Sequence, residues 1–120
     1  MSIKLAIYLC GPYTKPDPVE NTRNAILLGQ RLRDEFGVIT LTPHFLLAEH
    51  LISPRPYDYW LSVGVDMLSR CDALFRIEGE SLGADLEEQY AKKMNMPVFH
   101  DEVTLSAWVE KTYESWRKEF

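Results

Sequence analysis

The sequence contains few of the residues that build metal centres and disulfide frameworks. Its 120 residues include only two cysteines, Cys10 and Cys71, which form no CxxC pair. The three histidines, His44, His50 and His100, form no HxH or HxxxH pair. We therefore expect buried free thiols and no metal site.

The sequence also lacks long apolar segments and an excess of positive charge. No apolar run approaches the length of a membrane span, and residues 1–5 have neither the apolar stretch nor the cleavage site of a signal peptide. We expect a cytoplasmic protein that binds no membrane. The net charge of −5 makes nucleic acid a poor partner. Backbone N–H groups can still hold a small anion.

Three familiar motifs are missing as well. The sequence has no GxGxxG, no P-loop and no GxSxG elbow. Dinucleotide binding, triphosphate binding and acyl hydrolysis are therefore not supported.

The sequence does show a regular alternation of strand-like and helix-like segments. In the clearest helix, Ala25, Leu28, Leu32 and Phe36 recur at spacings of three and four, and Gly37 ends it. Strands are expected at 3–9, 38–41, 72–77 and 97–100, and helices at 19–36, 57–70, 84–94 and 105–118. Residues 44–56 are expected to be irregular, with at most one helical turn. The pattern predicts one domain, residues 1–120, with an α/β fold: a three-layer flavodoxin-like or Rossmann-like sandwich around a parallel sheet of four to five strands.

In such sheets, ligands bind at the carboxyl ends of the strands, so the loops after the first and third strands should hold the site. The second of these loops leads into a helix that carries Glu87. A carboxylate near a helix start is stabilised in its ionised form, as a nucleophile requires. Ser81 and Gly83 lie just upstream, where a hydroxyl and free N–H groups can hold an anion. In the alternative interpretation, Ser81 is only a helix cap and Glu87 only a surface acid.

Other candidates lie after the first two strands or on the second long helix. Gly11 allows the backbone to approach a ligand closely after the first strand. His44 follows the second strand and is either a site residue or a structural histidine. Asp66 either faces the site or is a solvated acid. Trp60 and Tyr57 either stack on a base or pack in the core.

Four motifs together resemble the nucleoside 2-deoxyribosyltransferase superfamily over roughly residues 3–100. They are Ile-Tyr-Leu-Cys-Gly-Pro at 7–12, Leu-Thr-Pro-His at 41–44, Cys-Asp-Ala-Leu at 71–74 and Ser-Leu-Gly-Ala-Asp-Leu-Glu at 81–87. The 2′-deoxynucleoside 5′-phosphate N-hydrolase branch is similar, and so is a short uncharacterised branch with a Gly-Pro-Tyr start.

The resemblance implies roles for individual residues. Glu87 matches the nucleophile, Tyr8 an aromatic residue beside it and Ser81 a serine that contacts the 5′-phosphate. His44 matches a histidine of the pocket. The loop around the sugar-phosphate end is matched by Gly11, Pro12, Tyr13 and Thr14.

Two positions depart from the pattern of the superfamily. The hydrolase branch has an arginine in the first loop, where this chain has Thr14 and then Lys15. The superfamily also has an aspartate at the position of Gly64, and Asp66 is the nearest acid that could replace it.

The activity implied by the resemblance is cleavage or transfer of the N-glycosidic bond of a 2′-deoxynucleoside or its 5′-monophosphate, without a metal or other cofactor. The alternative is a non-catalytic nucleotide-binding or nucleotide-sensing module on the same fold. A homodimer or larger homo-oligomer is also implied. The last helix, with Trp108 and Trp116, either forms its interface or packs on its own sheet.

Overall fold

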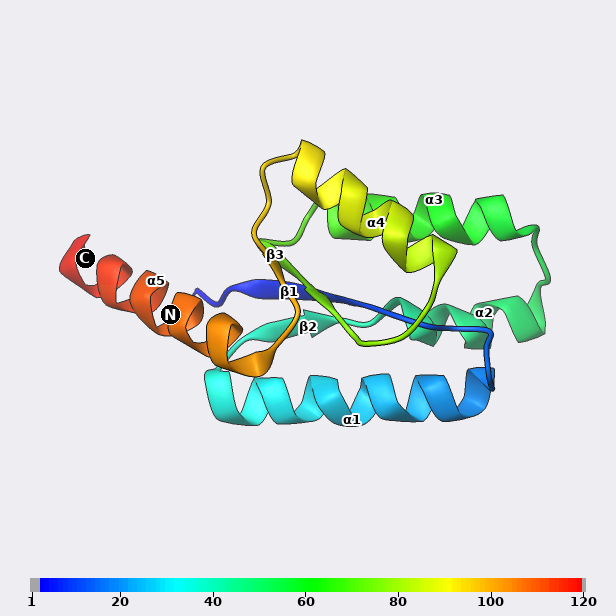
Figure 1. Cartoon of the computed structure of the whole chain (residues 1–120), viewed down its shortest axis with the longest axis horizontal. Coiled ribbons are helices and arrows are strands. Elements are labelled where there is room, and N and C mark those ends of the chain that lie inside the picture. The colour runs from blue at the N-terminus through cyan, green and yellow to red at the C-terminus, as the bar shows by residue number, and fades with distance from the viewer. Residues whose placement is uncertain (1–2, 120) are drawn as a thin grey trace.

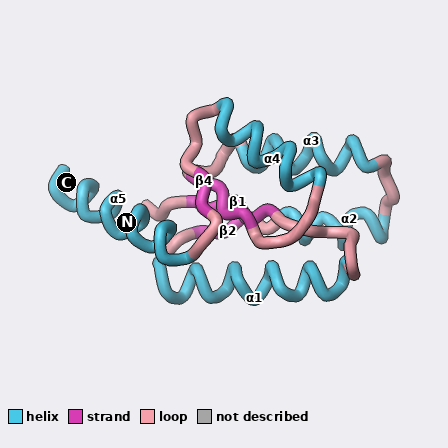
Figure 2. The backbone as a smooth tube through the Cα atoms, viewed as in Figure 1, coloured by secondary structure: helices cyan, strands magenta, loops and turns pink. Residues whose placement is uncertain are grey.

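The computed structural model describes residues 3–119, and a four-stranded parallel sheet forms its middle layer (Figure 2). The strands are β1 (Ala6–Cys10), β2 (Ile39–Leu41), β3 (Ala73–Arg76) and β4 (Val98–Phe99). Their order is β2-β1-β3-β4, and every neighbouring pair is parallel. The predicted α/β sandwich with a four-stranded parallel sheet is therefore confirmed.

Helices cover both faces of this sheet (Figure 1). The lower face in the view packs against α1 (Pro18–Phe36) and α5 (Glu102–Glu119), and the upper face against α3 (Tyr57–Leu68) and α4 (Leu82–Lys93). The two helices of each pair contact each other. No helix within residues 3–119 is both long enough and apolar enough to cross a membrane.

Strand β1 contributes buried side chains to both faces of the sheet, because successive side chains of a strand point to opposite sides. Ile7 and Leu9 join the apolar cluster beneath α1 and α5, whereas Tyr8 and Cys10 face α3 and α4. All four side chains are fully buried. This alternation places Tyr8 on the face where the helix with Glu87 lies.

Local signals define the ends of α1. The Asp17 carboxylate accepts a hydrogen bond of 3.0 Å from the Val19 backbone N–H, as an N-cap residue does. Gly37 follows the helix with a φ of +65°, a left-handed conformation that glycine adopts without strain. Both ends agree with the sequence prediction to within one residue.

The prediction for residues 44–56 was wrong. The chain forms a short 3-10 turn at Pro43–Phe45 and then the helix α2 (Leu46–Ile52). The apolar residues Leu46, Leu47, Leu51 and Ile52 form no single stripe, and no residue of α2 is fully buried. A helix without one apolar face has no periodic signal to detect.

Candidate active site

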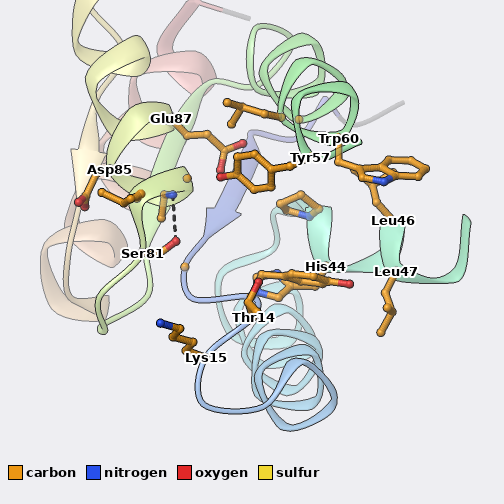
Figure 3. Close-up of a pocket in the computed structure, with 18 of the residues that line it drawn as sticks. Thr14, Lys15, His44, Leu46, Leu47, Tyr57, Trp60, Ser81, Asp85 and Glu87 are labelled. Atoms are coloured by element: carbon orange, nitrogen blue, oxygen red, sulfur yellow. Dashed lines mark hydrogen bonds between the residues drawn. The ribbon is translucent and has the colours of Figure 1, made fainter. Parts of the chain in front are cut away.

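A cavity of about 1040 Å³ opens at the carboxyl ends of β1 and β3 (Figure 3). It lies where the strand order reverses, because β1 connects through α1 to β2 on one side and pairs with β3 on the other. Its walls come from the loops after β1 and β3, from residues 43–50 and from α3 and α4. The predicted loops therefore do border one pocket.

Glu87 lines this cavity and is nonetheless only 8% exposed. The hydroxyl of Tyr8, which is fully buried, donates a hydrogen bond to Glu87 Oε2. Residues 79 positions apart in the chain thus form a buried polar pair, in which Glu87 lines the cavity and Tyr8 lies behind it without lining the cavity itself. One carboxylate oxygen is held by Tyr8, which leaves Oε1 for a ligand.

The expected cause of ionisation at Glu87 was wrong. Helix α4 begins at Leu82, so Glu87 is its sixth residue and lies beyond the first turn, where the helix dipole acts most strongly. Burial instead raises the pKa of Glu87 to about 7. The hydrogen bond from Tyr8 and the charge of Arg76 act in the opposite direction and lower this pKa.

Gly64, a buried residue of α3, makes room for the pair. A Cβ at this position would lie 2.7 Å from Glu87 Oε2 and 2.8 Å from Tyr8 Oη. No side chain fits there unless the pair moves. The position that the superfamily pattern fills with an aspartate is therefore occupied here by the Glu87 carboxylate and the Tyr8 hydroxyl.

Asp66 does not take over that position. Its side chain is exposed and does not line the cavity. Two residues along a helix correspond to a rotation of about 200°, so Asp66 points away from the face on which Gly64 meets Glu87. The expectation that Asp66 belongs to the site is corrected accordingly.

His44 lines the cavity and is 3% exposed. Its Nε2 donates to the Pro12 carbonyl at 3.0 Å, which ties the first loop to the turn after β2. Burial lowers the pKa of His44 and favours the neutral ring. Nδ1 is then an acceptor, and it has no partner within residues 3–119. Pro12 itself does not line the cavity and contributes through its carbonyl.

Most of the other predicted residues also border the cavity: Gly11, Tyr13, Thr14, Trp60, Ser81 and Gly83. The Ser81 hydroxyl accepts a hydrogen bond of 3.1 Å from the Ala84 N–H, so Ser81 is the N-cap of α4 as well as a lining residue. The Trp60 indole N–H donates to His50 Nδ1 at 2.8 Å, which fixes Trp60 in the wall of the cavity.

Sequence reasoning missed several polar lining residues, among them Lys15, Arg55, Arg76 and Asp85. Arg76 ends β3 and is held by Asp85 at 2.7 Å and by the Gly79 carbonyl at 2.8 Å. The same rule that selected His44, a polar residue at the end of a strand, would have found Arg76. Within residues 3–119, no three His, Cys, Asp or Glu side chains gather as metal ligands would.

The family comparison matches residues 5–100 to a model described as "Domain of unknown function (DUF4406)". The chain belongs to this family. A search of curated proteins found no match.

Among solved structures, the chain is similar to the "2-desoxiribosyltransferase from Leishmania mexicana". The TM-score is 0.56 at 22% sequence identity, and the match covers 78% of this DUF4406 chain. The chain spans only 61% of the length of that protein. The likeness confirms the fold that the resemblance to the deoxyribosyltransferase superfamily implies.

Proposed function

We propose that the protein cleaves or transfers the N-glycosidic bond of a 2′-deoxynucleoside or its 5′-monophosphate, with Glu87 as the nucleophile. The observation that carries this proposal is a buried carboxylate that borders a large cavity at the carboxyl edge of the sheet, with one oxygen held by Tyr8. The fold shared with a protein titled a deoxyribosyltransferase supports it.

The chemistry suits a carboxylate in this position. As the bond between the sugar and the base breaks, its electron pair leaves with the base and positive charge develops at the anomeric carbon. Glu87 Oε1 attacks that carbon and forms a glycosyl ester. Water or a second base then attacks the same carbon and releases the Glu87 carboxylate, which gives hydrolysis or transfer. A 2′-deoxy sugar leaves room for the carboxylate beside this carbon.

The attacking form of Glu87 is the ionised one. Because burial raises its pKa to about 7, the active fraction increases as the pH rises through neutrality. Tyr8 orients the carboxylate through Oε2 and favours its ionised form. Arg76, Lys15 and Ser81 border the same cavity and provide cationic and hydroxyl groups for a 5′-phosphate.

The test is chromatography of base release from a panel of deoxynucleosides and their 5′-monophosphates, with and without a free acceptor base. We expect Glu87→Ala to lower release about a thousandfold or more. Glu114→Ala is the matched control, because Glu114 is an exposed glutamate of α5 that does not line the cavity. No release by the wild type, or equal release by Glu87→Ala, would defeat the proposal.

A second candidate function is a nucleotide-binding module without turnover. It is favoured by one observation: among the described residues, α3 contributes no carboxylate to the cavity, since Gly64 lies at the facing position and Asp66 is exposed. This alternative predicts that deoxynucleotides raise the melting temperature while no base is released. Base release that depends on Glu87 would rule it out.

We also propose a homodimer. Trp108 packs on Phe99, with ring centroids 5.4 Å apart, and Trp116 packs on Tyr113 at 5.4 Å. Both tryptophans pack against the apolar core of their own chain. Helix α4 and the residue after it instead expose an apolar stripe at every fourth residue, consisting of Leu82, Leu86, Tyr90 and Met94. Light scattering should give the mass of two chains for the wild type and of one chain for a Leu86→Glu, Tyr90→Glu double variant. A monomeric wild type would contradict this proposal.

A further inference from the structure

Tyr57 is the first residue of α3, and its side chain reaches across the cavity to the start of α4. A Cβ on Gly83 would overlap the Tyr57 hydroxyl oxygen. Gly83 has no positive φ, so its backbone does not require glycine. The space that it leaves is filled by the Tyr57 hydroxyl.

The same side chain lies beside Glu87 in the cavity (Figure 3). Burial and then the charges of Glu87 and Asp58 raise the pKa of Tyr57. The phenol therefore keeps its proton at neutral pH and remains a hydrogen-bond donor. It makes no hydrogen bond within residues 3–119, in contrast to the Tyr8 hydroxyl, which is committed to Glu87.

Three other donors that border the cavity are already engaged. His44 Nε2 donates to the Pro12 carbonyl, and the Trp60 indole donates to His50. Arg76 is held by Asp85 and by the Gly79 carbonyl. Within residues 3–119, the side chains of Thr14 and Lys15 are not engaged, but they lie across the cavity from Glu87, whereas Tyr57 is an uncommitted donor beside it (Figure 3).

The proposed reaction needs such a donor. When the glycosidic bond breaks, the electron pair moves onto the base, and a hydrogen bond to a nitrogen or oxygen of the base stabilises this charge as it develops. A carboxylic acid on α3 could serve, but Gly64 has no side chain and Asp66 points away. The donor to the departing base must therefore come from another residue, and Tyr57 at the start of α3 is placed for it.

We propose that Tyr57 contacts the departing base and donates a hydrogen bond to it as the glycosidic bond breaks, and that Gly83 is a glycine because this hydroxyl occupies its side-chain space. The proposal rests on the proposed function. It adds a leaving-group contact from a residue that the motifs of the resemblance do not include.

The test compares wild type with Tyr57→Phe on two purine deoxynucleosides, one unmodified and one methylated at N7. The methylated purine is cationic before cleavage and leaves as a neutral molecule, so it needs little help from a donor. We expect Tyr57→Phe to lower kcat/KM about a hundredfold for the unmodified substrate and only about twofold for the methylated one. Blanks without protein correct for spontaneous loss of the methylated base.

Gly83→Ala provides an independent test, because its Cβ displaces the hydroxyl without removing it. This variant should reproduce the selective loss on the unmodified substrate. In the Tyr57→Phe background, where no hydroxyl remains to be displaced, it should have little further effect. Full activity of Gly83→Ala on both substrates would overturn the assignment.

The outcomes separate the two proposals. Equal losses on both substrates in Tyr57→Phe would overturn the role of Tyr57, because a structural defect does not distinguish between leaving groups. That result would leave Glu87 as the nucleophile. Absence of base release by the wild type on both substrates would instead defeat the proposed function, and the role of Tyr57 with it.

Discussion

The two faces of the sheet are built in different ways from the same strands. On the side of α1 and α5, the buried cluster is built from apolar side chains, among them Ile7, Leu9 and Leu32, and the buried polar groups beside it are the hydroxyls of Thr40 and Thr42. On the side of α3 and α4, the buried cluster includes the small residues Ala84 and Ala91 of α4, and the polar pair Tyr8–Glu87 is buried on the same side. One face is packed for stability, and the other leaves room for a cavity and a carboxylate.

The face with the cavity contains a group that lowers the stability of the fold. Burying a carboxylate without a full ion pair destabilises its charged form. Helix α3 brings Gly64 to the Tyr8–Glu87 pair, and α4 brings Gly83 to the hydroxyl of Tyr57. The apolar face must offset the cost, and the two faces should therefore respond differently to substitution.

The largest effect on stability is expected on the apolar face. Leu32 is fully buried there, and Leu32→Ala should lower the free energy of unfolding by about 2–5 kcal/mol. Urea titration measures this loss. Base release per folded molecule should stay unchanged, since Leu32 lies on the far side of the sheet from Glu87. A change in substrate turnover that exceeds the folded fraction would contradict the separation of the two faces.

The next largest effect on stability depends on pH and arises from Glu87, on the face with the cavity. The pKa of Glu87 is raised from its ordinary 4.5 to about 7, so its contribution to stability is fully present below about pH 4.5 and is lost as the pH rises through 7. The loss from this group is about 3 kcal/mol. Urea titrations at several pH values should show it in the wild type. A Glu87→Gln variant with the same pH dependence would contradict this assignment.

Paired glycine substitutions compare the two faces directly. Gly64→Ala places a Cβ 2.7 Å from Glu87 Oε2 and should lower the free energy of unfolding by about 1–3 kcal/mol, with a loss of base release. Gly29→Ala on α1 places a Cβ at 3.3 Å from Thr40 Oγ1 and should change stability by less than about 1 kcal/mol. Thermal unfolding of both variants tests the difference, and equal losses would refute it.

The smallest effect is expected at the start of α4. Ser81→Ala removes the hydroxyl that accepts from the Ala84 N–H and should cost about 1 kcal/mol of stability. Ser62→Ala, at an exposed position within α3, is the control and should stay within about 0.5 kcal/mol of the wild type. If both serines behave alike, the cap contributes nothing measurable.

Local patterns were enough to predict the sheet, the long first helix and the two loops that border the cavity. The apolar run of β1 and the periodicity from Ala25 to Phe36 are properties of neighbouring residues, and they were sufficient to locate the first strand and the first helix. The segment at α2 escaped detection because its apolar residues form no stripe. Local signals therefore identify elements only where one face is consistently apolar.

The site itself was predicted in part. Glu87, His44 and Ser81 follow strand ends, and the structure places them around one cavity. The burial of Glu87 could not be predicted, because it results from contacts with Tyr8 and Gly64, which are distant in the chain. The orientation of Asp66 depends on how α3 lies on the sheet, and no local pattern determines this.

The role of Glu87 as nucleophile is tested most directly by a search for the glycosyl ester on its carboxylate. The protein is mixed with a deoxynucleoside that it cleaves, quenched in acid within the first turnover and digested for peptide mass spectrometry. If Glu87 is the nucleophile, the peptide that contains Glu87 carries a 2-deoxyribosyl group, and the corresponding peptide of Glu87→Gln carries none. Base release by Glu87→Gln at the wild-type rate, without an adduct on the wild-type peptide, would contradict this role.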